Sequence, residues 1–263
     1  MMNYRKITLN ISDWLADYMD ESELEGWVIG VSGGVDSAVA ATLAAETAYP
    51  VICLNMPIHQ AKDQLSRADE QIDWLTNKYE DVCGKTVDLT GLFDCALSSI
   101  PKDGRSKLAD ANTASRLRML TLYSYAAANK SMVVGTGNKV EDHGVGFFTK
   151  YGDGGVDISP IADLTKTEVR NLARHLGIPD SVINAIPTDG LWEDDRSDEE
   201  QIGATYAELE WAMSEHDLQK GDEECLDWKV FSERESEVMK IYLHRHKTSR
   251  HKLSLPPVYV LPR

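Results

Sequence analysis

The stretch Gly30-Val31-Ser32-Gly33-Gly34-Val35-Asp36-Ser37 decides the fold. It follows an apolar run, Trp27–Val31, and opens an alanine-rich segment, Ser37–Thr47. This order predicts a strand, a tight glycine turn and a helix. Glycines let backbone N–H groups approach an anion closely, and the N-terminus of the helix adds partial positive charge. The stretch therefore predicts a phosphate-binding loop at the carboxyl end of a strand.

This loop lacks both the lysine of the P-loop NTPases and the glycine spacing of the dinucleotide-binding turn. It carries Asp36 instead, and this carboxylate would repel bound phosphates unless a divalent cation stood between them. Mg²⁺ is the natural choice for oxygen ligands. A glycine-rich turn without a ligand is the alternative, but it explains neither the hydroxyls of Ser32 and Ser37 nor the acid between them.

Apolar runs alternate with segments of helical periodicity on both sides of the loop. This pattern predicts an α/β fold, a doubly wound parallel sheet with helices on both faces and ligands beyond the carboxyl ends of its strands. The expected strands are Trp27–Val31, Pro50–Met56, Lys85–Leu89 and Ser131–Gly135. The expected helices are Ile11–Met19, Ser37–Thr47, Lys62–Tyr79, Thr113–Asn129 and Lys166–Leu176.

The chain length of 263 residues suits a single large domain. We expect an N-terminal helical segment in 1–26 and a C-terminal helix and tail in 228–263. No run approaches the roughly 18 apolar residues of a membrane-spanning helix, and the N-terminus lacks the apolar stretch of a signal peptide. The four cysteines are scattered without a C-x-x-C spacing. A cytoplasmic protein without a zinc site or a disulfide framework is therefore expected.

The formal charge is −16, from 27 lysines and arginines against 43 aspartates and glutamates. A general surface for nucleic acid or for an anionic membrane is therefore not expected. The phosphate-bearing ligand that the loop predicts must then be met by cations gathered locally.

The S-G-G-x-D-S run within Gly30–Ser37 resembles the loop of the ATP pyrophosphatases, which split ATP into AMP and pyrophosphate. The shared chemistry that this implies is adenylation of a substrate oxygen, followed by attack of a nitrogen or sulfur nucleophile. NAD synthetases, GMP synthetases, asparagine synthetases and tRNA-thiolating enzymes all carry such a loop. The loop alone leaves the substrate open.

A second stretch narrows the choice. Gly135-Thr136-Gly137-Asn138-Lys139-Val140-Glu141 and the later run Gly146–Asp157, GFFTKYGDGGVD, resemble the signature of the NAD synthetases. The likeness continues through Asp163–Glu168 and Pro187-Thr188. It implies a flavodoxin-like fold of the adenine-nucleotide α-hydrolase type. It also implies amidation of deamido-NAD⁺ with ammonia, in which ATP adenylates the nicotinate carboxylate and ammonia displaces AMP.

The resemblance also implies the residues of the site. Mg²⁺ would be held by Asp36 and Glu141, and Lys166 would supply the catalytic cation missing from the loop. ATP would contact Gly30, Val31, Ser32, Gly33, Gly34, Val35, Asp36, Ser37, Thr136, Lys166 and Thr188. Deamido-NAD⁺ would contact Arg116, Lys150, Asp157, His251 and Lys252. Asp157 has a second expected role, as the group that orients ammonia or accepts an ammonium proton.

Two features depart from the commoner pattern or extend beyond it. One extra residue lies between Glu141 and the Gly-Phe-Phe run, so Asp142 is a possible partner or substitute in the metal role. The acidic stretch after Thr188 stands where the family has a mobile cover. We therefore expect a mobile loop over the site at residues 187–205.

The nitrogen source and the assembly follow from the same resemblance. Glutamine-dependent relatives carry a separate amidase domain, and we expect none before Trp27 or after Lys252, so free ammonia is the expected donor. An amidotransferase acting in trans stays open. A homodimer is implied as well.

Two alternatives remain. A GMP synthetase or a tRNA-thiolating enzyme shares the first loop, but the chain lacks the reactive-cysteine motifs and the basic surface that thiolation of tRNA requires. A non-catalytic ATP-binding protein is the other alternative, and the intact set of Asp36, Glu141 and Lys166 argues against it.

Overall fold

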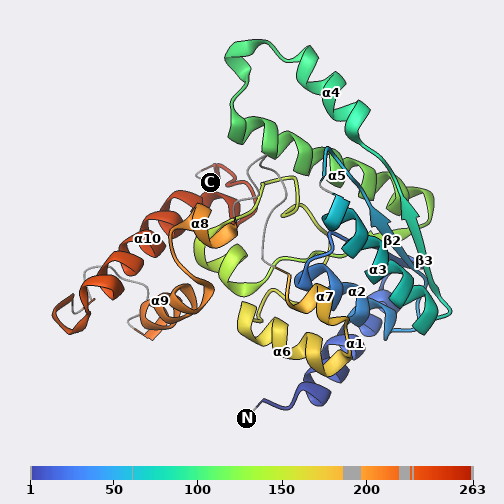
Figure 1. Ribbon diagram of the computed structural model, residues 1–263, viewed down its shortest axis with the longest axis horizontal. Coiled ribbons are helices and arrows are strands. Elements are labelled where there is room, and N and C mark those ends of the chain that lie inside the picture. Colours follow the sequence, from blue (N-terminus) through green and yellow to red (C-terminus); the bar gives the residue numbers. More distant parts are fainter. Residues whose placement is uncertain (1, 61, 186–196, 219–225, 227, 262–263) are drawn as a thin grey trace.

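A computed structural model describes residues 2–60, 62–185, 197–218, 226 and 228–261 (Figure 1). Its centre is a parallel sheet of four strands in the order β3-β2-β1-β4. The strands are β1 (Gly26–Gly30), β2 (Val51–Asn55), β3 (Val82–Thr86) and β4 (Ser131–Val133). The chain moves outward from β1 to β3 and then returns to the other side of β1. This reversal makes a topological switch point between β1 and β4, where ligands of such sheets bind.

One face of the sheet is covered by helices α1 (Tyr4–Glu21), α2 (Val35–Ala45), α3 (Lys62–Lys78), α6 (Lys166–Leu176) and α7 (Asp180–Ile183). Helix α2 is buried along almost its whole length, because its alanines let neighbouring helices and the sheet approach closely. Its first turn therefore has a fixed position at the end of β1.

The opposite face is covered by the long helix α5 (Lys107–Ala128), which packs Met119 and Leu122 against Val28, Leu54 and Val133 of the sheet. Helix α4 (Thr90–Ser99) and the short turn η1 (Lys102–Gly104) precede α5, and α4 buries none of its residues. Helices on both faces complete the doubly wound arrangement.

A second group of helices stands beside the carboxyl end of the sheet (Figure 1). We call it the helical lobe: α8 (Asp198–Ile202), α9 (Tyr206–Leu218), η4 (Trp228–Val230), α10 (Glu233–Ser249) and η5 (Arg250–Lys252). The lobe has its own apolar core, which includes Tyr206, Leu209, Met239 and Tyr242. The π-turn η2 (Val140–Val145) packs into the same core and joins the lobe to β4.

The segment after Glu141, where an extra residue is expected, forms this π-turn. A π-turn has one more residue per hydrogen-bonded turn than an α-helix, so an insertion widens the turn without displacing its ends. Gly146 ends the turn in the left-handed conformation, with φ of +60°.

The four predicted strands are confirmed, but the third had the wrong bounds: it is Val82–Thr86 and not Lys85–Leu89. Val87 and Leu89 are apolar because they pack against the α5 face of the sheet beyond the strand, and their N–H groups bond to Asn55 and Pro57. Helix α2 begins two residues earlier than predicted, and two others, α1 and α5, begin at least six residues earlier because polar caps precede them. Asn3 accepts the N–H of Lys6 at α1, and Ser106 accepts the N–H of Ala109 at α5.

The predicted mobile loop at 187–205 falls mostly on residues 186–196, outside the described residues. Its last part is a helix, not a loop. Ser197 and Glu200 form a capping box at the start of α8, and Gly203 ends the helix with φ of +92°. These local start and stop signals were present in the acidic stretch, but the loop was predicted from the family's mobile cover at this position.

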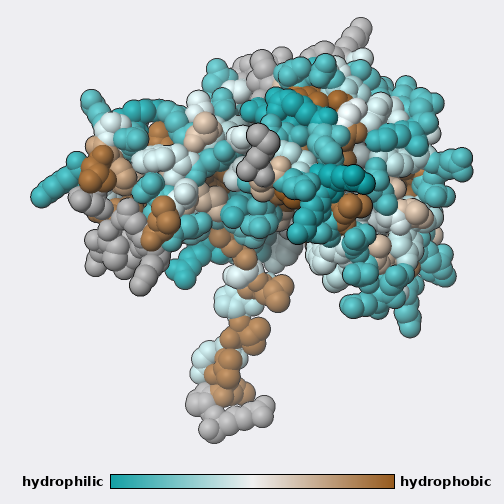
Figure 2. Space-filling model, turned by 90° about the horizontal axis from the view of Figure 1, so that it is seen from below, coloured by the Kyte–Doolittle hydropathy of each residue, from teal (hydrophilic) through white to brown (hydrophobic). Residues whose placement is uncertain are grey.

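The described part of the chain contains no helix with the length and apolar character needed to cross a membrane. Several of its exposed apolar side chains lie near the C-terminus. Figure 2 shows a C-terminal segment standing away from the body, and its apolar residues, Leu255, Val258, Tyr259, Val260 and Leu261, are all exposed.

Candidate active site

A cavity of about 860 Å³ opens at the carboxyl end of the sheet, at the switch point between β1 and β4. The loop after β1, the segment after β4 and the first half of α5 line one side of it. The helical lobe lines the other side with residues from α8, α10 and η5. Its volume and its mixture of apolar walls with converging polar groups are typical of a small-molecule site.

The phosphate loop is held ready by its own hydroxyls. The N–H of Ser32 donates to Oγ of Ser37 at 3.2 Å, and the N–H of Gly34 donates to Oγ of Ser32 at 3.2 Å. Gly33 has φ of +78°, a conformation that favours glycine. Gly34 precedes α2 without a side-chain cap, so N–H groups of the first turn stay available to an anion. All eight residues from Gly30 to Ser37 line the cavity.

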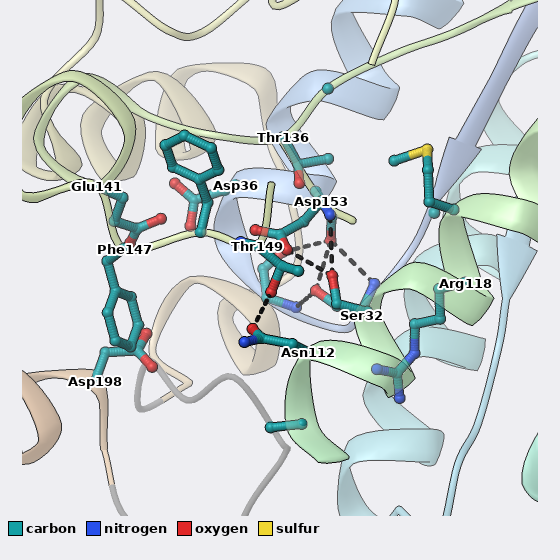
Figure 3. Close-up of a pocket in the computed structure, with 18 of the residues that line it drawn as sticks. Ser32, Asp36, Asn112, Arg118, Thr136, Glu141, Phe147, Thr149, Asp153 and Asp198 are labelled. Carbon is teal, nitrogen blue, oxygen red and sulfur yellow. Dashed lines mark hydrogen bonds between the residues drawn. The ribbon is translucent and has the colours of Figure 1, made fainter. Parts of the chain in front are cut away.

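Three charged side chains meet beside this loop (Figure 3 labels the two acids). Nζ of Lys166 lies 2.5 Å from Oδ2 of Asp36 and 2.9 Å from Oε1 of Glu141. The Lys166 side chain is 4% exposed, and each carboxylate side chain is 16% exposed. Lys166 begins α6, which is fixed there by the capping box of Thr165 and Glu168. One buried ammonium group therefore bridges two acids that come from different elements.

Asn138 joins the two acids through hydrogen bonds. Its Nδ2 donates to Oδ1 of Asp36 at 3.2 Å, and its Oδ1 accepts the N–H groups of Val140 and Glu141 at 3.1 Å each. The residue is completely buried. Sequence reasoning assigned it no role, although it stands inside the second motif, two residues after Thr136.

Tyr206 reaches the same cluster from the helical lobe. Its hydroxyl donates to Oε1 of Glu141 at 2.5 Å and lies 3.2 Å from Oδ2 of Asp198. Nζ of Lys166 lies 4.7 Å from the centre of its ring. Sequence reasoning missed Tyr206 and Asp198, because neither stands in the motifs that flank the site. The capping signals of α8 and α9 were the sequence features that could have drawn attention to them.

The electrostatics of the cluster follow from burial and charge. Burial lowers the pKa of Lys166, but Asp36 and Glu141 together raise it above its usual value, so the ammonium group stays charged. Burial, with repulsion from Glu141, raises the pKa of Asp36 despite Lys166. The pKa of Glu141 is lowered, because Lys166 and the Tyr206 hydroxyl outweigh the effect of burial. Burial and the nearby acids raise the pKa of Tyr206, so its hydroxyl stays protonated and donates.

Cations gather in the cavity despite the charge of −16 on the whole chain. Its lining includes Arg67, Arg116, Arg118, Lys150, Lys166, Arg245 and Lys252. Nε of Arg118 donates to the carbonyl of Met56 at 3.0 Å, which fixes the guanidinium group at the end of β2 (Figure 3). Sequence reasoning assigned Arg116 and overlooked Arg118 two residues later. The local concentration of cations is what an anionic ligand requires of an acidic protein.

The residues expected to hold a dinucleotide are partly brought together. Arg116, Lys150, His251 and Lys252 all line the cavity. Nζ of Lys150 donates to the carbonyl of His251 at 2.7 Å, and Nζ of Lys252 donates to the carbonyls of Gly146 and Phe148 at 2.7 and 2.8 Å. These bonds tie η5 to the loop that follows the π-turn.

Asp153 is an acid of the cavity that sequence reasoning passed over. Its Oδ1 accepts the Ser115 hydroxyl at 2.6 Å and the N–H of Thr149 at 3.0 Å, and the Thr149 hydroxyl donates to Asn112 at 2.7 Å (Figure 3). This network ties the glycine-rich loop to α5. Its only sequence signal is membership of that loop, four residues before Asp157.

Two expected residues lie outside the cavity lining, and a third falls outside the described residues. Asp157 is exposed and is not among the residues that line the cavity; it accepts hydrogen bonds from the Tyr123 hydroxyl and the N–H of Val133, both at 2.8 Å. Asp142 lies against Gly137, outside the cavity lining, and makes no contact with Lys166 among the interactions of the described residues. Thr188 lies outside the described residues, whereas Thr136 lines the cavity.

The donor set of the cluster fits a divalent cation. Two carboxylates converge on one positive charge, which the Lys166 ammonium supplies here. No cage of three or more metal-binding side chains occurs in the described ranges. Mg²⁺ commonly takes one or two carboxylates and completes its shell with phosphate oxygens and water, so two acids beside a phosphate loop suit it.

Comparisons with known proteins agree with this geometry. Residues 7–256 match the model of the NAD synthase family. The chain is 36% identical to an NH3-dependent NAD(+) synthetase of Carboxydothermus hydrogenoformans, over 99% of both chains. A solved NMN synthetase of Francisella tularensis is 30% identical, with a TM-score of 0.84 over 99% of this chain and 100% of that one. An NH3-dependent NAD synthetase of Campylobacter jejuni shares the fold, with a TM-score of 0.79 and 24% identity over 98% and 100% of the two chains.

Proposed function

The chain belongs to the NAD synthase family, and from this premise we propose how its cavity performs the reaction. It is an ATP-using ligase with ammonia-dependent NAD⁺ synthetase activity. The observation that carries the mechanism is the meeting of Asp36, Glu141 and Lys166 beside the phosphate loop. Each group has a distinct task in bringing a triphosphate and a carboxylate together.

The proposed reaction has two steps. In the first, the nicotinate carboxylate of deamido-NAD⁺ attacks the α-phosphorus of ATP, a new O–P bond forms, and pyrophosphate leaves. In the second, the nitrogen of ammonia attacks the activated carbonyl carbon, AMP leaves with the bridging oxygen, and the nitrogen loses a proton to give the amide. Activation is required because a free carboxylate is a poor electrophile for ammonia.

ATP is proposed to place its phosphates in the loop from Gly30 to Ser37. The N–H groups at the start of α2 and the loop hydroxyls would donate to phosphate oxygens. Thr136 and Thr188 are retained as proposed ATP contacts. Asp36 and Glu141 would hold Mg²⁺, which supplies positive charge to the leaving pyrophosphate.

Lys166 is proposed as the catalytic cation of the first step. In the described structure its single positive charge bridges the two acids. With a cation held by those acids, the Lys166 ammonium group would donate to phosphate oxygens, where negative charge develops as pyrophosphate leaves.

The nicotinate nucleotide is proposed to bind on the cationic side of the cavity. Arg116, Lys150, His251 and Lys252 provide donors for its pyrophosphate bridge and sugar hydroxyls. Binding would exchange the internal bonds of Lys150 and Lys252 to backbone carbonyls for bonds to the ligand.

Asp157 is retained as a proposed substrate contact, but its expected role as a proton acceptor has little geometric support. Its two carboxylate oxygens already accept bonds from Tyr123 and Val133, and it stands outside the cavity lining. A general base has to reach the proton that it removes. We propose that Asp157 meets substrate beside Tyr123 of α5.

A homodimer is the proposed assembly. Leu120 and Tyr123 of α5 and Leu108 near its start are exposed, and so is the apolar C-terminal segment. A second copy of the chain would cover such surface. Light scattering at micromolar concentration tests this, with twice the monomer mass expected and the monomer mass as the contradicting result. The cytoplasmic location stays a prediction.

A second candidate substrate comes from one observation. Among the solved structures compared here, the NMN synthetase has a TM-score of 0.84, above the 0.79 of the Campylobacter jejuni NAD synthetase. Amidation of nicotinate mononucleotide to NMN uses the same chemistry on a smaller nucleotide. The mononucleotide lacks the adenylate half that a dinucleotide would place against the cations of α5 and η5.

Release of pyrophosphate with each nucleotide tests both candidates. With ATP, Mg²⁺ and ammonium, we expect deamido-NAD⁺ to yield NAD⁺, AMP and pyrophosphate in equal amounts. The ratio of kcat/KM for deamido-NAD⁺ and nicotinate mononucleotide decides which nucleotide is the substrate. A kcat/KM that favours the mononucleotide would contradict the first candidate, and no pyrophosphate with either would contradict both.

A further inference from the structure

We propose that Tyr206 is a positioning residue for the metal: its hydroxyl holds the Glu141 carboxylate in the orientation that the cation requires. The inference rests on the proposed role of Asp36 and Glu141 as ligands of Mg²⁺. Tyr206 belongs to neither sequence motif, and it comes from the helical lobe rather than from the sheet.

The first argument is the way in which the oxygens of Glu141 are used. Oε1 accepts two donors, Nζ of Lys166 at 2.9 Å and the Tyr206 hydroxyl at 2.5 Å. The Asn138 side chain also donates to this carboxyl group. Two donors on one oxygen fix the rotation of the carboxylate. With a cation in the place of the Lys166 ammonium group, the tyrosine would remain as the donor that keeps this rotation.

The second argument separates the hydroxyl from the ring. The ring packs among Leu209, Met239 and other apolar side chains of the lobe, and a phenylalanine would pack there equally well. The hydroxyl is 2.5 Å from one acid and 3.2 Å from another, Asp198, in a residue that is only 2% exposed. A hydroxyl donor that lies between two buried carboxylates restricts the orientation of those carboxylates.

The third argument is the architecture. Glu141 stands in the π-turn, which has no strand or long helix of its own to hold it. Asn138 fixes its backbone from the side of the sheet, and Tyr206 fixes its carboxylate from the side of the lobe. The metal pair thus depends on the packing of two regions. A donor that orients a metal ligand in this way commonly changes metal affinity by 10-fold to 100-fold when it is removed.

The test compares Tyr206→Phe with Tyr242→Phe. Tyr242 is a matched control, because it is equally buried in the core of the lobe and its hydroxyl contacts no carboxylate among the interactions of the described residues. The readout is the dissociation constant of Mn²⁺ with α,β-methylene-ATP, measured from the electron paramagnetic resonance signal of free Mn²⁺. The non-cleavable analogue makes the measurement independent of turnover.

We expect Tyr206→Phe to bind Mn²⁺ about 10-fold more weakly than the wild type, and Tyr242→Phe to bind it equally well. In the pyrophosphate assay, Tyr206→Phe should need about 10-fold more Mg²⁺ for half-maximal rate while its kcat at saturating Mg²⁺ stays within about threefold. Rescue by high Mg²⁺ is a result that general damage to the fold would not produce.

The outcomes separate this inference from the proposed function. If the wild type binds Mn²⁺ and Tyr206→Phe binds it equally well, the role of Tyr206 is wrong and the metal assignment stands. If the wild type binds no Mn²⁺ with the analogue, the assignment of Asp36 and Glu141 is wrong, and the role of Tyr206 is wrong with it.

A second variant covers a failure of Tyr206→Phe to fold, which circular dichroism would report. Asp198→Asn keeps the whole of Tyr206 and alters only the second acid beside its hydroxyl. It should keep Mn²⁺ affinity within about twofold of the wild type, because the neutral amide competes less than a carboxylate for the hydroxyl and the bond to Glu141 remains. A larger loss of Mn²⁺ affinity in a folded Asp198→Asn protein would show that the second acid, and not the Tyr206–Glu141 bond, supports the metal, and would count against the inference.

Discussion

The sheet and the helical lobe contribute to one cavity in different ways. The sheet contributes consecutive residues: the eight from Gly30 to Ser37 all line the cavity, and their own hydroxyls hold them in place. The lobe contributes residues from three separate elements, α8, α10 and η5, and the Tyr206 hydroxyl meets a carboxylate 65 positions away in the chain. The phosphate loop depends on contacts among neighbouring residues of the chain. The Tyr206 contact exists only while the helical lobe packs beside the sheet. The difference makes the lobe the more sensitive half of the site.

The largest effect is expected where the two halves meet. Lys166→Met should lower the rate of pyrophosphate release by about 10³-fold, because it removes the charge that stabilises the leaving group. Steady-state assays at saturating ATP and Mg²⁺ measure it. Lys139→Met is the control, because Lys139 pairs with Asp163 at 3.0 Å and does not line the cavity. A loss smaller than about fivefold would contradict the role of Lys166.

Core substitutions sharpen the comparison of the two regions. Leu209→Ala in the lobe and Leu43→Ala in α2 each truncate a fully buried leucine, and each should cost about 3 kcal/mol of local stability. Hydrogen exchange should show faster opening of α9 and α10 in the first variant, and of α2, β1 and β2 in the second. Equal acceleration of both regions in both variants would mean that the two cores unfold as one unit.

The fold and the phosphate loop follow from local signals, whereas the other expected site residues came from the resemblance to the NAD synthetases. Short patterns of glycine, hydroxyl-bearing and apolar residues predict the phosphate loop and the four strands. The order of the strands then places Asp36 near Glu141. The bounds of β3 were predicted wrongly because Val87 and Leu89, which follow the strand, pack in the same core as the strand residues of the sheet. Tyr206 was missed because its contact with Glu141 requires the helical lobe to pack beside the sheet, and no local sequence pattern predicts that packing.

Asp142, the acid beside the proposed metal ligand Glu141, offers a test by pH. Burial, with the charges of Glu141, Asp153 and Asp36, raises the pKa of Asp142 to about 8 from a usual value of 3.8. The unfolded chain therefore releases this proton at lower pH than the folded protein does. The free energy of unfolding should fall as pH rises from about 4 to about 8 and should level off above that.

Asp142→Asn removes this dependence. We expect the variant to be more stable than the wild type at pH 8 by about 2 kcal/mol, less than the full shift implies because the side chain is partly exposed. Urea unfolding in the presence of a chelator, at several pH values, measures it. The exposed Asp17→Asn should keep the slope of the wild type. The same slope in Asp142→Asn would show that Asp142 titrates normally.

The smallest effect is expected at Asp157, outside the cavity lining. Asp157→Asn should keep kcat within about threefold at saturating ammonia, since a general base would contribute at least 10²-fold. Its KM for the nucleotide reports separately on substrate contact. A 10²-fold loss of kcat at pH 8.5 would restore the proton-accepting role that its position disfavours.

The central claim is that one cation site is made by Asp36, in the first turn of α2, and by Glu141, which the lobe holds in place. The most direct measurement is the anomalous signal of Mn²⁺ in crystals grown with α,β-methylene-ATP. We predict a peak between the two carboxylates, with the triphosphate in the loop from Gly30 to Ser37 and Lys166 moved onto a phosphate oxygen. A triphosphate bound elsewhere, or a peak away from both carboxylates while Lys166 still bridges them, would contradict the account.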